Sequence, residues 1–130
     1  MATVLIVDDA EDLCFSLGNL VKKEGYSLIT AATGGTALDV LRTNIVDLIF
    51  LDIGLPDING IDLITTIREI SADSDIIMLT GKNDAKTAVE SLKAGAIDYI
   101  VKPFDLIEFT TTMNRIMQSR LAAKIALLDS

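Results

Sequence analysis

The 130-residue chain contains no histidine, no tryptophan and a single cysteine, Cys14. Without histidine it cannot contain a Ser-His-Asp triad, a zinc site of the common kinds or a phosphohistidine carrier. One cysteine allows neither an internal disulfide nor a thiolate metal cluster. Basic residues are also scarce: 11 lysines and arginines stand against 19 acidic residues, which gives a formal charge of −8. We therefore expect this segment to bind neither nucleic acid nor an anionic membrane surface directly.

The sequence also lacks a basic leader and long apolar runs. Too few apolar residues separate Met1 from Asp8 for a signal peptide, and no run is long enough to cross a bilayer. These features predict a cytoplasmic protein. Half of the residues are nevertheless apolar and 23% are charged, so we expect a folded core rather than disorder. A chain of this length forms one domain.

Short apolar runs alternate with amphipathic segments along the whole chain. The runs lack polar alternation, which suits strands buried on both faces of a parallel sheet. They are Val4–Val7, Leu28–Ala32, Leu48–Leu51, Ile76–Leu79 and Ile97–Val101. Helical spacing of apolar residues predicts five helices between and after them, with Gly25 and Gly95 ending the first and the fourth. We predict a flavodoxin-like (βα)5 three-layer α/β sandwich with a parallel sheet in strand order 2-1-3-4-5.

The last predicted helix is longer than the edge of one sheet requires. It can run from near Asp105 to about Leu128. Its core stripe would be Leu106, Phe109, Met113 and Ile116. A further stripe at i, i+4 and i+7, with no obvious part of the domain to cover it, is Leu121, Ile125 and Leu128. We expect a domain over 1–118 and an extension over 119–130 that frays, pairs with a second copy or leads into an output domain.

Polar residues follow four of the five predicted strands. Asp8 and Asp9 follow the first strand, Asp52 the third, Thr80 the fourth and Lys102 the fifth. Parallel strands present their carboxyl ends at one edge of the sheet, so the predicted strand order brings these groups into one pocket. Close carboxylates repel one another by about 4 kcal/mol per pair at an effective dielectric of 20. That cost makes sense in a site for a hard divalent cation such as Mg²⁺.

The same set of groups suits phosphoryl transfer. A carboxylate can act as the nucleophile, while a cation, an ammonium and a hydroxyl stabilise the charge of the phosphoryl group. Lys102 should remain protonated beside the acidic residues. Taken singly, the two aspartates could cap a helix, and Thr80 or Lys102 could simply end a strand. Their coincidence at four strand ends favours a site.

Motifs with compatible spacing extend over residues 3 to about 118. They are Leu5-Ile6-Val7-Asp8-Asp9, Asp47-Leu48-Ile49-Phe50-Leu51-Asp52, Leu55-Pro56, Asn59-Gly60, Met78-Leu79-Thr80-Gly81, Gly95-Ala96, Asp98-Tyr99 and Val101-Lys102-Pro103-Phe104. Together they resemble the receiver domain of bacterial two-component response regulators. The resemblance implies that Asp52 is the phosphoacceptor and receives its phosphoryl group from a sensor histidine kinase. It also implies an Mg²⁺ site made of Asp8, Asp9, Asp52 and the backbone carbonyl of Gly54.

The resemblance further assigns roles in switching. Thr80 would donate its hydroxyl to the phosphoryl group, and Lys102 would pair with a phosphoryl oxygen. Tyr99 matches the aromatic residue that moves inward with that hydroxyl, although it could simply pack at the sheet edge. The output face of such domains usually comprises the fourth helix, the fifth strand and the fifth helix. A homodimer would use this face or the extended last helix.

Two positions border the path of a water that would hydrolyse the phosphoryl group. Gly54 and Lys82 each lie two residues after a site residue, and both positions vary in this family. Gly54 has no side chain, so we expect the phosphoryl group to be more exposed to hydrolysis.

Three alternative functions fit the sequence less well. A phosphatase resembling the haloacid-dehalogenase group would place its nucleophile after the first strand, whereas Asp52 follows the third. A flavin binder would need a loop rich in Ser, Thr and Gly after the first strand, where this chain has Asp8 and Asp9. A receiver-shaped binding module would not need all the site residues. Beyond transferring phosphate to and from its own aspartate, we expect no enzyme activity. The chain could act alone or as part of a transcriptional regulator.

Overall fold

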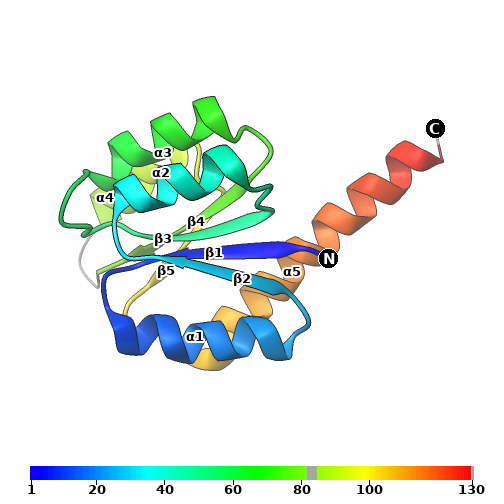
Figure 1. Ribbon diagram of the computed structural model, residues 1–130, viewed down its shortest axis with the longest axis horizontal. Coiled ribbons are helices and arrows are strands. Elements are labelled where there is room, and N and C mark those ends of the chain that lie inside the picture. Colours follow the sequence, from blue (N-terminus) through cyan, green and yellow to red (C-terminus); the bar gives the residue numbers. More distant parts are fainter. Residues whose placement is uncertain (82–84, 130) are drawn as a thin grey trace.

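The computed structural model describes residues 1–81 and 85–129. Within these residues, strands and helices alternate from β1 to α5 (Figure 1). The strands are β1 (Thr3–Val7), β2 (Ser27–Ala31), β3 (Leu48–Asp52), β4 (Asp75–Thr80) and β5 (Asp98–Val101). The helices are α1 (Glu11–Lys23), α2 (Gly34–Thr43), α3 (Gly60–Ile70), α4 (Ala85–Ala94) and α5 (Leu106–Leu128). Lys82, one of the two positions that border the water path, lies outside the described residues.

The strands form a single sheet in the order β2-β1-β3-β4-β5, and each neighbouring pair is parallel. Helices α2, α3 and α4 cover one face of this sheet, and α1 and α5 cover the other (Figure 1). The predicted strand order and the flavodoxin-like three-layer sandwich are therefore confirmed. This order also places the carboxyl ends of β1, β3, β4 and β5 along one edge.

The central strands are buried on both faces because their alternate side chains point to opposite helical layers. In β3, Leu48 and Phe50 belong to the core beneath α1 and α5, whereas Ile49 and Leu51 belong to the core beneath α2 and α3. All four side chains are fully buried. The ring centroid of Phe50 lies 4.4 Å from that of Phe109 on α5. The edge strands β2 and β5 are only partly buried.

Local sequence determines where the helices begin and end. Thr33, Asn59 and Asp105 are the N-caps of α2, α3 and α5, and each side chain accepts a hydrogen bond from a first-turn backbone N–H. Gly25 and Gly95 follow α1 and α4 with φ angles of 91° and 132°. Such angles favour glycine, and they confirm the predicted ends of these two helices.

Helix α5 extends well beyond the sheet, as predicted from its length (Figure 1). Its buried side chains are Phe109, Met113, Ile116 and Met117. Leu106, which was also expected in the core, is 50% exposed, so that prediction is wrong. The ring of Phe104 stacks 6.2 Å from that of Phe109 and covers this end of the core instead.

The C-terminal part of α5 carries the expected exposed stripe of Leu121, Ile125 and Leu128. The boundary at residue 118 stays a prediction, but Arg120, two residues beyond it, contacts the sheet edge opposite the strand carboxyl ends. None of the described helices combines the length and apolar character that crossing a bilayer would require.

Candidate functional site

The structure brings the three predicted carboxylates together at the carboxyl edge of the sheet. Asp8 and Asp9 directly follow β1, and Asp52 is the last residue of β3. Each residue offers a carboxylate oxygen, and these oxygens all lie within 4.8 Å of one another. Asp8 is buried, Asp52 is half-buried and Asp9 is exposed. We refer to these three residues as the acid cluster.

Lys102 compensates part of the negative charge. It directly follows β5, and its Nζ lies 2.8 Å from Oδ2 of Asp8 and 3.5 Å from Oδ1 of Asp52. Burial by itself would lower the pKa of Lys102, but the hydrogen bond to Asp8 and the charges of Asp52 and Asp8 raise it overall. Lys102 is therefore an ammonium at neutral pH. One ammonium against three carboxylates leaves room for a further positive charge.

Backbone and side-chain contacts fix the orientation of the acid cluster. Oδ1 of Asp8 accepts a hydrogen bond from the N–H of Ala10 at 2.9 Å. Oδ1 of Asp52 accepts one from the N–H of Gly54 at 3.2 Å. Cys14, which no motif in the sequence marks as part of this site, also contacts it: its thiol donates to the carbonyl oxygen of Asp8 at 3.3 Å. Burial and the charge of Asp8 raise the pKa of the Cys14 thiol, so it is not a reactive thiolate.

Thr80, the last residue of β4, is buried with an exposed fraction of 1%. Its hydroxyl finds no hydrogen-bond partner within residues 1–81 and 85–129. A buried hydroxyl without a partner is costly, so a ligand oxygen at the acid cluster would relieve that cost. The hard oxygen donors of the acid cluster likewise fit a divalent cation. Two independent features thus point to an anionic ligand bound together with a cation.

The remaining predicted residues lie close to this edge. A side chain at Gly54 would have its Cβ 3.9 Å and 4.0 Å from the carboxylate oxygens of Asp52, which is ordinary contact. Tyr99 lies on β5 and is 39% exposed. It lines a hollow of about 540 Å³ together with Lys102. The inward movement of Tyr99 and a ligand role for the carbonyl of Gly54 stay predictions.

The family model described as "Response regulator receiver domain" matches residues 4–114. The chain belongs to this family. A receiver domain protein described as CheY-like, from Methanospirillum hungatei JF-1, superposes with a TM-score of 0.89 at 29% identity, over 95% of this chain and 98% of that one. The receiver resemblance inferred from the motifs is thus confirmed.

Two curated relatives of the receiver are much longer than this chain. Transcriptional regulatory protein KdpE of Mycobacterium tuberculosis is 35% identical over 123 residues, which are 95% of this chain and 54% of that protein. Regulatory protein AtoC of Escherichia coli K12 is 33% identical over 115 residues, which are 88% of this chain and 25% of that protein. The receiver therefore spans about half the length of the first relative and about a quarter of the second.

Proposed function

We propose that this receiver is a phosphorylation-dependent signalling switch and that Asp52 is its phosphoacceptor. A sensor histidine kinase would supply the phosphoryl group in the cytoplasm. The observation that carries this proposal is the meeting of three carboxylates, one ammonium and one buried hydroxyl, without a partner in the described part of the chain, at a single edge of the sheet. Among the described residues at this edge, Asp52 combines a carboxylate at a strand end with contact to Lys102 and partial exposure, whereas Asp8 is buried and Asp9 is exposed.

In the transfer step, a carboxylate oxygen of Asp52 attacks the phosphorus of the kinase's phosphohistidine. An O–P bond forms to Asp52 as the N–P bond to the imidazole breaks. The electron pair of the N–P bond stays on the imidazole, which takes up a proton from solvent and leaves as the neutral base. Asp8, Asp9 and Asp52 would hold Mg²⁺, with the carbonyl of Gly54. Bound there, Mg²⁺ supplies positive charge that offsets the charge of the phosphoryl oxygens.

Lys102 and Thr80 then respond to the new group. Phosphorylation replaces one carboxylate charge with a dianionic group that carries several acceptor oxygens. Lys102, now 3.5 Å from Asp52, would pair with one phosphoryl oxygen. The Thr80 hydroxyl would donate to another and gain the partner that the described residues do not offer. The shift between two states is limited by how much more tightly the second state holds the phosphoryl group.

Intact-protein mass after incubation with acetyl phosphate tests the proposal. We expect one phosphoryl adduct in the presence of Mg²⁺, none with EDTA and none in Asp52→Ala. Asp62→Ala, an exposed carboxylate in the first turn of α3, is the matched control and should form the adduct normally. Absence of any adduct in the wild type, or an adduct that persists in Asp52→Ala, would overturn the assignment. Absence of an adduct under every condition would indicate a receiver-shaped binding module.

Phosphorylation would act on partners through exposed apolar surface. On α4 and β5 this surface comprises Val89, Leu92, Tyr99 and Val101, and Ile97 lies between the two elements. On α5 it comprises Leu121, Ile125 and Leu128. We propose that the phosphorylated receiver pairs with a second copy through one of these surfaces.

Because the transcriptional regulator KdpE is about twice as long as its matched part, we further propose that this receiver controls an output domain. The alternative is a stand-alone receiver that acts by protein contact.

A further inference from the structure

The C-terminal part of α5 has an unusual environment for a helix. From Leu121 to Asp129 the side chains are exposed, although most of the sequence between them is apolar. Leucine, alanine and lysine favour helix, but two isolated turns of helix are marginal in water. A helix that leaves the domain in this way should fray unless something holds it at its base. We call residues 119–129 the arm.

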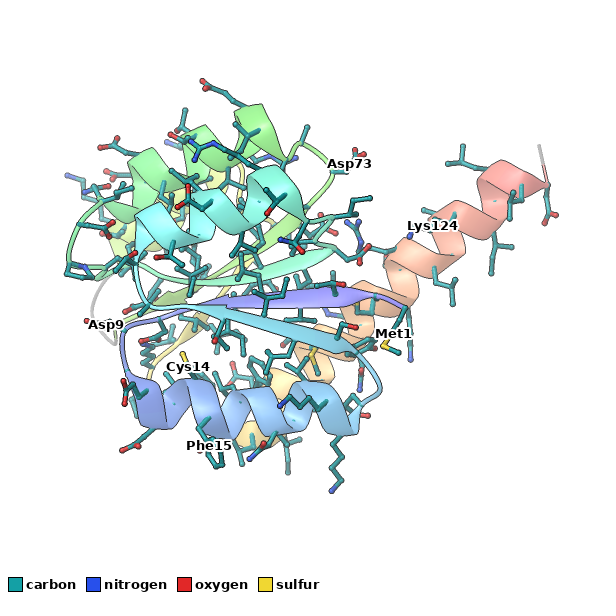
Figure 2. All side chains as sticks on the ribbon, in the orientation of Figure 1. Met1, Asp9, Cys14, Phe15, Asp73 and Lys124 are labelled. Atoms are coloured by element: carbon teal, nitrogen blue, oxygen red, sulfur yellow. The ribbon has the colours of Figure 1, made fainter. Side chains whose placement is uncertain are left out.

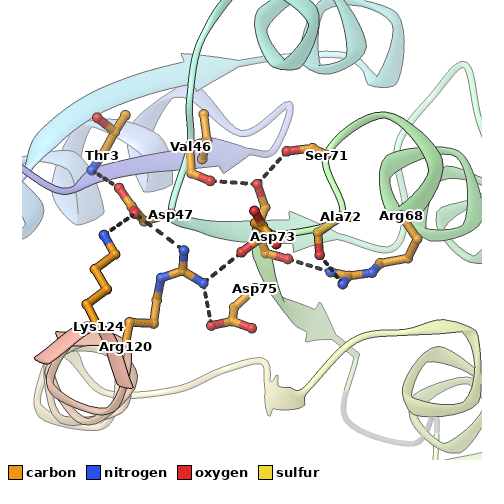
Figure 3. A network of polar contacts seen from close by, with 11 residues as sticks. Thr3, Val46, Asp47, Arg68, Ser71, Ala72, Asp73, Asp75, Arg120 and Lys124 are labelled. Atoms are coloured by element: carbon orange, nitrogen blue, oxygen red, sulfur yellow. Dashed lines mark hydrogen bonds and ion pairs between the residues drawn. The ribbon is translucent and has the colours of Figure 1, made fainter. Parts of the chain in front are cut away.

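Arg120 ties the base of the arm to the amino edge of the sheet (Figure 3). Its Nη1 donates to the carbonyl oxygen of Asp73 at 2.8 Å and to Oδ2 of Asp75 at 2.9 Å. Its Nη2 donates to Oδ1 of Asp47 at 3.4 Å. One turn further along the arm, Nζ of Lys124 lies 3.8 Å from the same oxygen of Asp47. The arm therefore makes ionic contacts with two strand starts.

The contacts of Arg120 differ in burial from an ordinary surface ion pair. The Arg120 side chain is 19% exposed, and the side chains of Asp47 and Asp75 are 13% and 27% exposed. Water and salt screen such a group only in part, and removing one partner leaves a poorly solvated charge behind. Arg115, on the same helix, pairs with Asp98 at 3.1 Å, but these side chains are 60% and 44% exposed. A pair of that kind contributes little.

The acceptors of Arg120 are themselves held in place (Figure 3). The guanidinium of Arg68 donates to the carbonyl oxygens of Ala72 and Ser74, in the loop between α3 and β4. The buried hydroxyl of Ser74 donates to the carbonyl oxygen of Val46 at 2.6 Å. This loop therefore presents the carbonyl of Asp73 to Arg120 in a fixed position. Little reorganisation is needed to form the contact.

The strands that anchor the arm also end in residues of the candidate site. Asp47 immediately precedes β3, which ends in Asp52, and Asp75 begins β4, which ends in Thr80. Oδ2 of Asp47 accepts a hydrogen bond at 2.8 Å from the N–H of Thr3, the first residue of β1. The base of the arm is thus connected to all three central strands.

We propose that Arg120 is a clamp that holds the arm in one fixed direction relative to the central strands. With the clamp closed, the arm is a rigid part of the receiver. Whatever binds the arm is then oriented by β1, β3 and β4 rather than by α4 and β5. The proposal does not depend on phosphorylation of Asp52.

Backbone dynamics of the whole chain test the clamp. In the wild type, the ¹⁵N heteronuclear NOE of residues 121–127 should match that of the sheet. In Arg120→Met these values should fall beyond residue 118 and remain unchanged over residues 106–117. Trypsin cleavage after Lys124, which requires local opening, should accelerate on the order of tenfold. Arg115→Met removes the same charge from the same helix and should behave like the wild type.

The proposal is overturned if the wild-type arm is already mobile or if Arg120→Met leaves both readouts unchanged. Equal effects of Arg120→Met and Arg115→Met would also overturn it, because charge alone would then explain them. Should Arg120→Met unfold as a whole, Asp75→Asn provides the second test. That variant weakens one acceptor and should loosen the arm to a smaller degree, whereas an arm as rigid as the wild type's would contradict the clamp.

Discussion

At the scale of single residues, Thr80 is buried, and its hydroxyl has no hydrogen-bond partner among the described residues. Thr80→Val removes that hydroxyl and keeps the shape of the side chain. We expect the free energy of unfolding of the unphosphorylated protein to rise by about 1 kcal/mol, because an unpaired buried donor is lost. Urea denaturation measures this change. Thr66→Val is the control: the Thr66 hydroxyl donates to the carbonyl of Asp62 at 3.1 Å, so no gain is expected there. A loss of stability in Thr80→Val would contradict the argument.

The ionisation of Asp57 should make the free energy of unfolding depend on pH. Its carboxylate accepts the N–H groups of Gly34 and Gly35 at the start of α2, both at 2.9 Å. These bonds lower the pKa of Asp57 from its usual 3.8. A carboxyl whose pKa is lower in the folded state stabilises the fold above its unfolded pKa and loses that effect as the pH falls through the folded pKa. Asp57→Asn should therefore be less stable than the wild type at pH 7.

The difference between Asp57→Asn and the wild type should fade as the pH falls below about 3.8. Urea denaturation at neutral and acidic pH measures it. Asp73→Asn is the control, since Asp73 is exposed and contacts Arg120 through its backbone carbonyl. A difference that persists unchanged in acid would show that the two hydrogen bonds do not depend on ionisation.

The absence of a side chain at Gly54 should shorten the lifetime of the phosphorylated protein. Its backbone lies beside the Asp52 carboxylate, and a Cβ there would make only ordinary contacts. Gly54→Met should therefore fold normally, cover the path of an attacking water and lengthen the phosphorylated lifetime several-fold. Intact mass followed over time after removal of acetyl phosphate gives the rate. An unchanged or shorter lifetime would show that water does not approach past this position.

Only those site residues that lie at strand ends could be predicted from the sequence. Asp8, Asp9, Asp52 and Lys102 could be placed together because parallel strands share one carboxyl edge. The contact of Cys14 with the Asp8 carbonyl could not, because it depends on how the first turn of α1 leaves β1. The unpaired state of the Thr80 hydroxyl likewise depends on the packing around it, which no spacing rule describes.

At the scale of elements, Gly95 sets the end of α4, because it directly follows the helix with a positive φ. A Cβ at this position would lie 2.8 Å from Cγ of Arg68, and the φ of 132° disfavours other residues. Arg68 cannot easily move, because it holds the carbonyls of Ala72 and Ser74. Gly95→Ala should cost about 2–3 kcal/mol of stability, from strain and displacement together.

Gly25→Ala separates these two contributions. Gly25 has a φ of 91°, but no atom of residues 1–81 and 85–129 lies within 4 Å of a Cβ there, so only the backbone strain should appear. Urea denaturation of both variants measures the difference. Equal losses of stability in the two variants would show that Arg68 yields without cost.

Element order and the length of α5 were predictable because buried strands and amphipathic helices leave different apolar patterns. The pattern failed where a neighbour replaced the expected residue, as Phe104 does for Leu106. The apolar pattern gave no indication of the contacts of Arg120, whose acceptor Asp47 is 73 positions away in the sequence. Contacts between charged residues so far apart have no periodicity to reveal them.

At the scale of the whole molecule, the exposed apolar surfaces predict self-association. We expect the sedimentation coefficient to rise with concentration, and more so after phosphorylation. Ile125→Glu on the arm and Val89→Glu on α4 are matched variants, because these side chains are 48% and 50% exposed. The variant that abolishes association identifies the surface in use. A strictly monomeric chain in both phosphorylation states would contradict pairing through either one.

The site and the clamp lie at opposite ends of the sheet. Figure 2 shows Asp9 at one end and Asp73 and Lys124 toward the other. Both ends depend on side chains from the same central strands, with fully apolar segments such as Leu48–Leu51 between them. The site and the clamp are therefore separated by the length of a strand, and the effects of substitutions at the two ends on the free energy of unfolding should add.

The charged residues at both ends of β3 also disfavour pairing of this strand with its neighbours in a shifted register. A slip of β3 by one residue would exchange its two apolar faces. The same slip would draw Asp52 away from Lys102 and Asp47 away from Arg120. Apolar runs alone would tolerate several alignments almost equally, because Leu48, Ile49, Phe50 and Leu51 are all large and hydrophobic. The charged residues that bracket the strand thus select one alignment among them.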